Sequence, residues 1–210
     1  EAAKLRAQRA TGAHGEALRT ARLLAKHQAF SKAAAQSLLR SLAFEVIDGR
    51  RDMDQLSRAY AQLDSADRQD PFVTARAALR AAKWGAHARG REWLAPLWQR
   101  LGDLDHAERD ALAQALLANL SGLSHDWLPR IESAERAFPH HALMQAVVGG
   151  AYAERQLWGK ARAPLQRAVA DASLPAQARR EAWRQLAVLA HAQGDTARAT
   201  MCVTQAAATD

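Results

Sequence analysis

The feature that most constrains this chain is a spacing of small and large apolar residues that occurs twice between residues 142 and 209. The first copy contains Gly149, Tyr152, Ala161 and Leu165, and the second contains Leu186, Ala187, Ala199 and Val203. Small residues let two helices approach closely, and we expect Tyr152, Leu165, Leu186 and Val203 to fill the space between them. The spacing therefore predicts two successive helical hairpins.

This arrangement follows the tetratricopeptide pattern, in which W-x2-L-G-x2-Y on one helix precedes A-x3-F on the next. Trp183 begins the clearer copy, and the Gly194-Asp195 pair marks its turn. One such hairpin cannot bury its apolar face alone, so it must stack on neighbouring hairpins. We therefore predict an all-α, tetratricopeptide-like α-solenoid of about six helical hairpins, forming a single superhelical domain over residues 1–210.

Weaker copies of the pattern precede these two, and local signals set the expected helix ends. Ser31 and Asp52 are suitable N-caps, and Pro175 can start a helix after the 171–177 loop. The polar 64–71 segment reads as a loop, and the second helix is expected to end near Ala29. The expected earlier helices span residues 1–10, 14–27, 31–47, 52–63, 71–82, 86–101, 105–120 and 124–138.

The net charge of +7 raises the possibility of an anionic partner such as nucleic acid. The basic residues do not form one block, however, because residues 101–150 contain three basic and seven acidic side chains. Most arginines are expected on solvated outer faces. The distribution therefore argues against nucleic acid as a partner.

Few residues in the sequence suggest catalysis or metal binding. The phosphate-loop, zinc-protease and nucleophile-elbow patterns are missing, and Cys202 is the one cysteine. The histidines are scattered apart from His140-His141, a pair of loop neighbours that more often face solvent than share a metal. We therefore expect neither an enzyme nor a metal site.

In a stacked array of helical hairpins, the first helix of each repeat lines the concave face. Arginines on this face are suited to hold a carboxylate or phosphate through forked hydrogen bonds. The alternative is that they pair with Glu154 or Glu181 and bind nothing specific. The predicted partner-binding groove comprises Arg80, Arg109, Leu112, Leu116, Asn119, Leu143, Ala146, Gly150, Glu154, Glu181, Arg184, Val188 and His191.

The run QLWGKAR at residues 156–162 resembles a segment of the bacterial HemY proteins of the haem-biosynthesis operon. Residues 15–18, Asp70-Pro71 and the 125–139 segment are also similar to that family. The resemblance implies a proteobacterial inner-membrane protein, anchored by a helical hairpin that precedes this chain, with its repeat domain on the cytoplasmic side. It also implies an association with late haem synthesis without catalytic activity.

Two functions follow as hypotheses. The first is a non-catalytic scaffold whose concave face binds another protein, such as a haem-pathway enzyme, through many modest contacts. The alternative is a haem or porphyrin carrier in which His191, His140 or Met144 supplies an axial ligand. The first hypothesis needs no cofactor, whereas the second needs haem.

Overall fold

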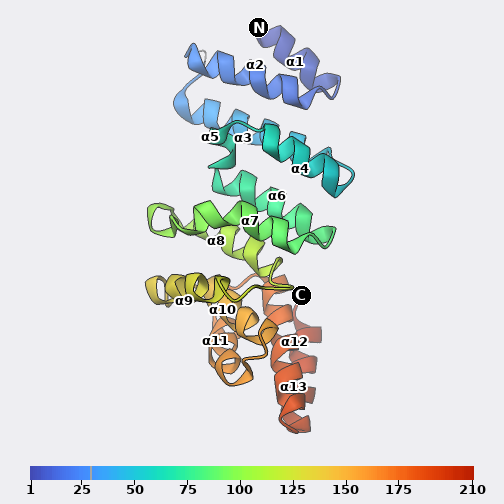
Figure 1. Cartoon of the computed structure of the whole chain (residues 1–210), viewed down its shortest axis with the longest axis vertical. Helices are drawn as coiled ribbons and strands as arrows, with labels where there is room; N and C mark the ends of the chain where they lie inside the picture. Colours follow the sequence, from blue (N-terminus) through green and yellow to red (C-terminus); the bar gives the residue numbers. More distant parts are fainter. Residues whose placement is uncertain (29) are drawn as a thin grey trace. The chain divides into compact units, whose positions relative to one another are not determined.

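The computed structural model describes residues 1–28 and 30–210. Over these residues the chain forms thirteen α-helices and one short 3-10 helix, without a strand (Figure 1). The all-α prediction is confirmed, and the pairwise packing of helices is consistent with a repeat solenoid, which itself stays a prediction. The helices form two compact units, Glu1–Ala86 and His87–Asp210, and each is described separately.

In the first unit, α1 packs on α2, α2 packs on α3, and α3 then contacts both α4 and α6. Its helices are α1 (Ala2–Ala10), α2 (His14–Lys26), α3 (Lys32–Asp48), α4 (Met53–Gln62), α5 (Ser65–Arg68) and α6 (Pro71–Lys83).

Two N-caps in this unit are as the sequence predicts. The Ser31 hydroxyl accepts the backbone N–H of Ala34 at 3.2 Å, and the Asp52 carboxylate accepts that of Gln55 at 2.8 Å. Each bond satisfies an amide that has no partner inside its own helix. Helix α2 ends at Lys26, while the expected break near Ala29 lies outside the described residues.

The expectation that residues 64–71 form only a loop is wrong, because they contain the short helix α5. Asp67 in this helix is buried, and Arg22 of α2 holds it by an ion pair of 2.5 Å. Burial raises the pKa of Asp67 above its ordinary value, although the hydrogen bond from Arg22 acts in the opposite direction. A distant arginine therefore draws this polar segment against the helices.

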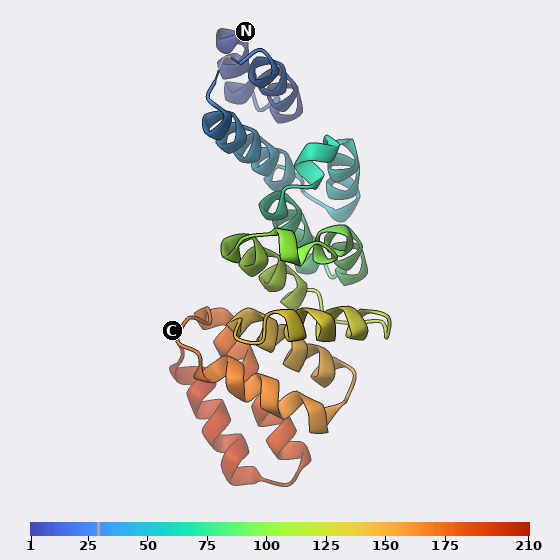
Figure 2. The same cartoon turned by 90° about the vertical axis from the view of Figure 1, so that its left-hand side faces the viewer.

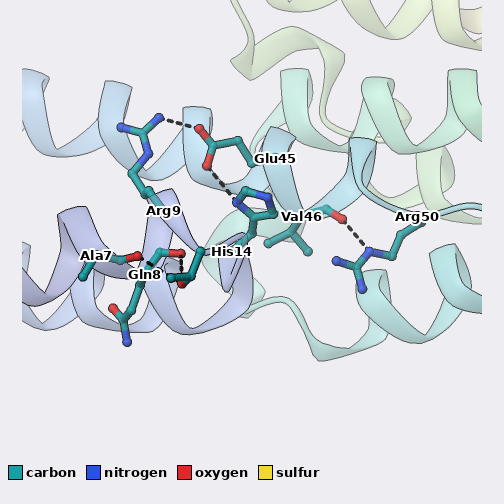
Figure 3. A network of polar contacts seen from close by, with 8 residues as sticks. Ala7, Gln8, Arg9, His14, Glu45, Val46 and Arg50 are labelled. Atoms are coloured by element: carbon teal, nitrogen blue, oxygen red, sulfur yellow. Dashed lines mark hydrogen bonds and ion pairs between the residues drawn. The ribbon is translucent and has the colours of Figure 1, made fainter.

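Glu45 of α3 connects the first two helices of the unit (Figure 3). One of its carboxylate oxygens pairs with Arg9 of α1, and the other lies 3.1 Å from Nδ1 of His14 on α2. Arg50, just after the end of α3, donates to the carbonyl oxygen of Val46 on that helix at 2.9 Å. These groups use one another as partners, so we interpret the network as structural.

In the second unit, helix α10 lies at the centre and packs on α8, α9, α11 and α12, while α12 and α13 lie side by side (Figures 1 and 2). The elements are α7 (His87–Trp98), the 3-10 helix η1 (Leu101–Asp103), α8 (His106–Leu117), α9 (Trp127–Ala137), α10 (Ala142–Glu154), α11 (Trp158–Ala170), α12 (Ala176–Ala192) and α13 (Thr196–Ala208).

The expected hairpin of α8 with α9 is not formed as predicted. Among the described residues these two helices share little contact, and both pack on α10 instead. Helix α8 ends at Leu117, three residues before the predicted end, and a long loop follows it. Side chains of α7 and α10 hold this loop through hydrogen bonds from Arg91 and to Glu154.

The small residue Gly149 sets the close approach of α10 and α11. A Cβ atom at this position would lie 2.5 Å from Cγ of Leu165, so only glycine leaves room for the leucine. Tyr152, Leu165 and Leu186 are buried as predicted. The prediction for Val203 is wrong, because its side chain is 58% exposed.

No helix among the described residues is both long and apolar enough to cross a membrane. The longest helices, α3 and α12, are each 17 residues long.

Candidate functional site

The candidate site is a hollow of about 440 Å³ in the second unit, called here the α12 hollow. It is bordered by the end of α8 and the loop after it, by the last turn of α10, by the start of α11 and by the middle of α12. Its lining residues are Leu117, Ala118, Leu120, Ser121, Gly150, Ala153, Glu154, Trp158, Glu181, Gln185 and Val188.

A buried arginine fixes the loop that forms one wall of the α12 hollow. Arg91 of α7 is only 5% exposed and donates to the carbonyl oxygens of Asn119, Ser121 and Gly122 at 2.6, 2.8 and 3.0 Å. Burial lowers the pKa of Arg91 from its usual value. These bonds satisfy carbonyls that follow the end of α8, where no helical partner remains.

Two further contacts hold the same loop from the side of α10. The Glu154 carboxylate accepts the backbone N–H of Gly122 at 2.8 Å. Gly150 allows Leu120 to lie against the helix, since a Cβ atom there would come within 2.7 Å of the leucine Cδ1. The wall of the hollow is therefore preformed and held on both sides.

The lining of the α12 hollow is apolar with an acidic edge. Among the described residues of the lining, Glu154 and Glu181 are the charged ones. Arg184 lies next to the lining and pairs with Glu181 at 3.6 Å, with both side chains about half exposed. Exposed pairs of this kind contribute little free energy, so Glu181 stays available to an incoming cation. The surface is therefore suited to an aliphatic group accompanied by a positive charge.

Four residues of the predicted groove line this hollow, and the others do not. Gly150, Glu154, Glu181 and Val188 are brought together, with Val188 55% exposed. The remaining exposed members, Arg184 and His191, lie on α12 outside the lining.

The placement of five other predicted groove residues needs correction, because their side chains are buried and cannot meet a partner. They lie on α8 and α10 or just after α8, and the helices packed on these elements cover them. These residues are Leu112, Leu116, Asn119, Leu143 and Ala146.

The predicted cluster of arginines for an anionic ligand also needs correction. Arg109 donates to the carbonyl oxygens of Leu101 and Leu104, and its guanidinium lies 4.4 Å from the centre of the Phe138 ring. Arg80 belongs to the first unit and donates to the carbonyl oxygen of Arg50 at 2.7 Å. Both guanidinium groups therefore stabilise their own unit.

Sequence reasoning missed several lining residues by one position along a helix. Gln185 lines the hollow instead of Arg184, and Leu117 does so instead of Leu116. One residue turns the side chain by about 100° around the helix axis, which is enough to move it into or out of the lining.

One of the axial ligands in the haem hypothesis is buried. Met144 is 1% exposed within α10, so a porphyrin could reach its sulfur only by disrupting the packing of this helix. His140 and His191 are exposed, but neither lines the α12 hollow. Of the three predicted axial ligands, only the two histidines are therefore accessible from outside.

A second hollow of about 470 Å³ lies between the end of α7 and α9. Trp98 borders it, and its indole packs against the Trp127 ring with centroids 6.4 Å apart. Arg130 is the one charged residue of its lining, and it also pairs with Asp126 at 3.6 Å. No predicted binding residue lies here, so this hollow is the weaker candidate.

The fold and the α12 hollow together define a class, an all-α protein of packed helical pairs with a preformed acidic hollow. No protein-family model matches this chain, and neither a curated protein nor a solved structure matches it significantly.

Proposed function

We propose that this chain is a non-catalytic protein-binding module, and that the α12 hollow takes an aliphatic side chain of a partner next to a basic residue. The main support for the proposal is the negative charge of the lining. In a chain with a net charge of +7, the charged side chains of this hollow are the two carboxylates of Glu154 and Glu181.

The chemistry of the lining favours binding over catalysis. Val188 and Leu117 offer aliphatic surface, and Ser121 is the only hydroxyl among the lining residues. The lining has no imidazole or thiol that would act on this hydroxyl as a base or serve as a nucleophile. A helix or extended peptide of a partner can instead place an apolar anchor in the hollow and a cation at its edge.

The resemblance of residues 156–162 to HemY proteins supplies the biological part of the proposal. On that basis the partner is a haem-pathway enzyme, and the scaffold acts at the bacterial inner membrane through a segment outside this chain. Trp158 belongs to the resembling run and also lines the hollow, which connects the two arguments.

Binding of defined peptides tests the proposal. Two labelled amphipathic peptides share a leucine face and differ only in carrying arginine or glutamate on the polar face. We expect the arginine peptide to bind and Glu181→Lys to weaken it about tenfold, because the substitution replaces attraction by repulsion. Glu92→Lys is the matched control, since Glu92 is exposed on α7 outside the lining and the change in net charge is the same.

Equal binding of both peptides, or equal weakening by the two lysine variants, would contradict the proposal. A photo-reactive residue at position 188 should crosslink to the arginine peptide, whereas the same residue at position 203, which is similarly exposed, should not. Co-purification of a haem-pathway enzyme that Glu181→Lys abolishes and Glu92→Lys preserves would support the pathway assignment.

A further inference from the structure

Three potential metal ligands from two parts of the second unit lie together outside the α12 hollow. His106 and Asp110 are one turn apart on α8, and His141 is the N-cap residue of α10. One ligand atom from each of the three residues lies within 4.8 Å of the other two. None of them lines the hollow, so this cluster is independent of the proposed function.

The distances within the cluster suit a common cation. Nε2 of His106 lies 3.5 Å from Oδ2 of Asp110, and Nε2 of His141 lies 3.0 Å from Oδ1 of the same carboxylate. Tetrahedral zinc with ligand bonds of about 2.0 to 2.1 Å keeps its ligand atoms about 3.3 Å apart. Each imidazole therefore lies at about this distance from one oxygen of the carboxylate, His106 from Oδ2 and His141 from Oδ1.

The two histidine side chains differ in exposure in a way that favours a metal site. The His141 side chain is 5% exposed and is held by its surroundings, whereas the His106 side chain is 72% exposed. The two imidazole rings lie 4.9 Å apart between centroids. A rotation of the exposed His106 side chain can close the remaining distance without moving the backbone.

We propose that His106, Asp110 and His141 bind a divalent transition-metal cation of the zinc type, with solvent completing the coordination. Two imidazole nitrogens and one carboxylate oxygen match the ligand preference of Zn²⁺ and Co²⁺ rather than that of Mg²⁺ or Ca²⁺. His141 and Asp110 come from different helices, so the cation would join the start of α10 to α8.

Metal binding has a structural consequence at His141. Its Nδ1 atom accepts the backbone N–H of Met144 at 3.3 Å, so the proton of the neutral ring sits on Nε2, toward Asp110. The cation replaces this proton on Nε2, and the neutral ring then carries its proton on Nδ1. The N-cap hydrogen bond is lost on binding, which couples the metal to the first turn of α10.

Titration of the full chain, without a histidine tag, with Co²⁺ tests the site. Tetrahedral Co²⁺ absorbs in the visible range, and we expect a saturable band at one cation per chain that Zn²⁺ abolishes. His106→Ala should lower the affinity more than about tenfold. The fold should survive this change because the side chain is mostly exposed. His140→Ala, next to the cluster but outside it, should leave the affinity unchanged.

His141→Asn provides a second test that separates ligation from folding. An asparagine can accept the Met144 N–H as an N-cap, so helix content should persist while the Co²⁺ band is lost. The absence of a saturable band in the native chain would overturn the proposal. So would equal affinities of the native chain and His106→Ala.

Discussion

Helices α10 and α13 have the same length of 13 residues, yet they are buried to very different extents. Every residue of α10 from Ala142 to Tyr152 is buried, whereas α13 buries only Cys202 and Ala206. Both helices are rich in small and aliphatic residues and belong to the two clear copies of the repeat pattern.

The difference comes from neighbours rather than from the helices themselves. Helix α10 packs on four other helices, α8, α9, α11 and α12, whereas α13 packs on α12. In α11 the residue at the large position of the pattern, Leu165, faces α10 and is 1% exposed. In α13 the residue at the same position, Val203, lies on an uncovered side. The same position of the pattern therefore contributes differently to the stability of the fold in each copy.

The largest expected effect is the contrast between Leu165→Ala and Val203→Ala. The first removes a buried side chain and leaves a cavity between α10 and α11, which costs about 2 to 5 kcal/mol. The second trims an exposed side chain and should change the free energy of unfolding by less than about 0.5 kcal/mol. Chemical denaturation followed by circular dichroism measures both values. Similar losses of unfolding free energy in the two variants would contradict the difference in burial between these positions.

A smaller effect is expected at Gly149, which sets the distance between α10 and α11. In Gly149→Ala the new methyl group would lie 2.5 Å from Cγ of Leu165 and 3.1 Å from its backbone nitrogen. The helices must separate, at a cost of about 1 to 3 kcal/mol.

Gly159→Ala is the matched control for that substitution. Gly159 lies near the start of α11 with open space around its Cβ position. Alanine there should stabilise the helix by up to about 1 kcal/mol, because glycine is a poor helix former. Thermal unfolding of the two variants should therefore shift in opposite directions, and a shared direction would argue against the tight contact at position 149.

The difference between local interactions and contacts with neighbouring helices explains which features of the fold were predictable from the sequence. Caps such as Ser31 and Asp52 depend on residues within three positions, so local reasoning identified them. Helix α5 depends on Arg22, more than forty residues away, and no local signal marks that ion pair. The orientation of α13 depends on which helices surround it, and a repeat pattern does not contain this information.

The candidate site was predictable only in part, because it also depends on how the helices pack on one another. Counting along the repeats puts Gly150, Glu154, Glu181 and Val188 on one predicted groove, and these four residues line the α12 hollow. The count is wrong for predicted groove residues on α8 and on α10, such as Leu112 and Leu143, because neighbouring helices of the unit bury them. The cluster around His141 joins residues of two elements, so spacing along the chain did not indicate it.

The ionisation of Tyr152 tests how completely α10 is buried. Burial raises its pKa to about 12, and its hydrogen bond of 3.0 Å to the Glu132 carboxylate acts in the same direction. The unfolded value is about 10, so the stabilisation linked to this group is complete below pH 10 and is lost as the pH rises toward 12.

Absorbance of phenolate at 295 nm measures this titration. The other tyrosine, Tyr60, also has a raised pKa because it is buried, so neither should ionise at about pH 10 until the chain unfolds. Tyr152→Phe should remove the contribution of one of the two tyrosines to this absorbance change and make the fold less sensitive to alkali. A native chain that titrates fully near pH 10 would show that α10 is less buried than described.

The smallest effect concerns Cys202, one of the two buried residues of the exposed helix α13. Its side chain is 2% exposed on a helix that packs on α12, and burial raises the pKa of the thiol above its ordinary value. The thiolate is the reactive form, so modification by a disulfide reagent should be slower in the native chain than in the unfolded chain. Met201→Cys in a Cys202→Ala background provides the control, because position 201 is 46% exposed on the same helix. Its thiol should react faster than Cys202, and equal rates would mean that α13 detaches from α12 in solution, so that even its two buried positions are open to solvent.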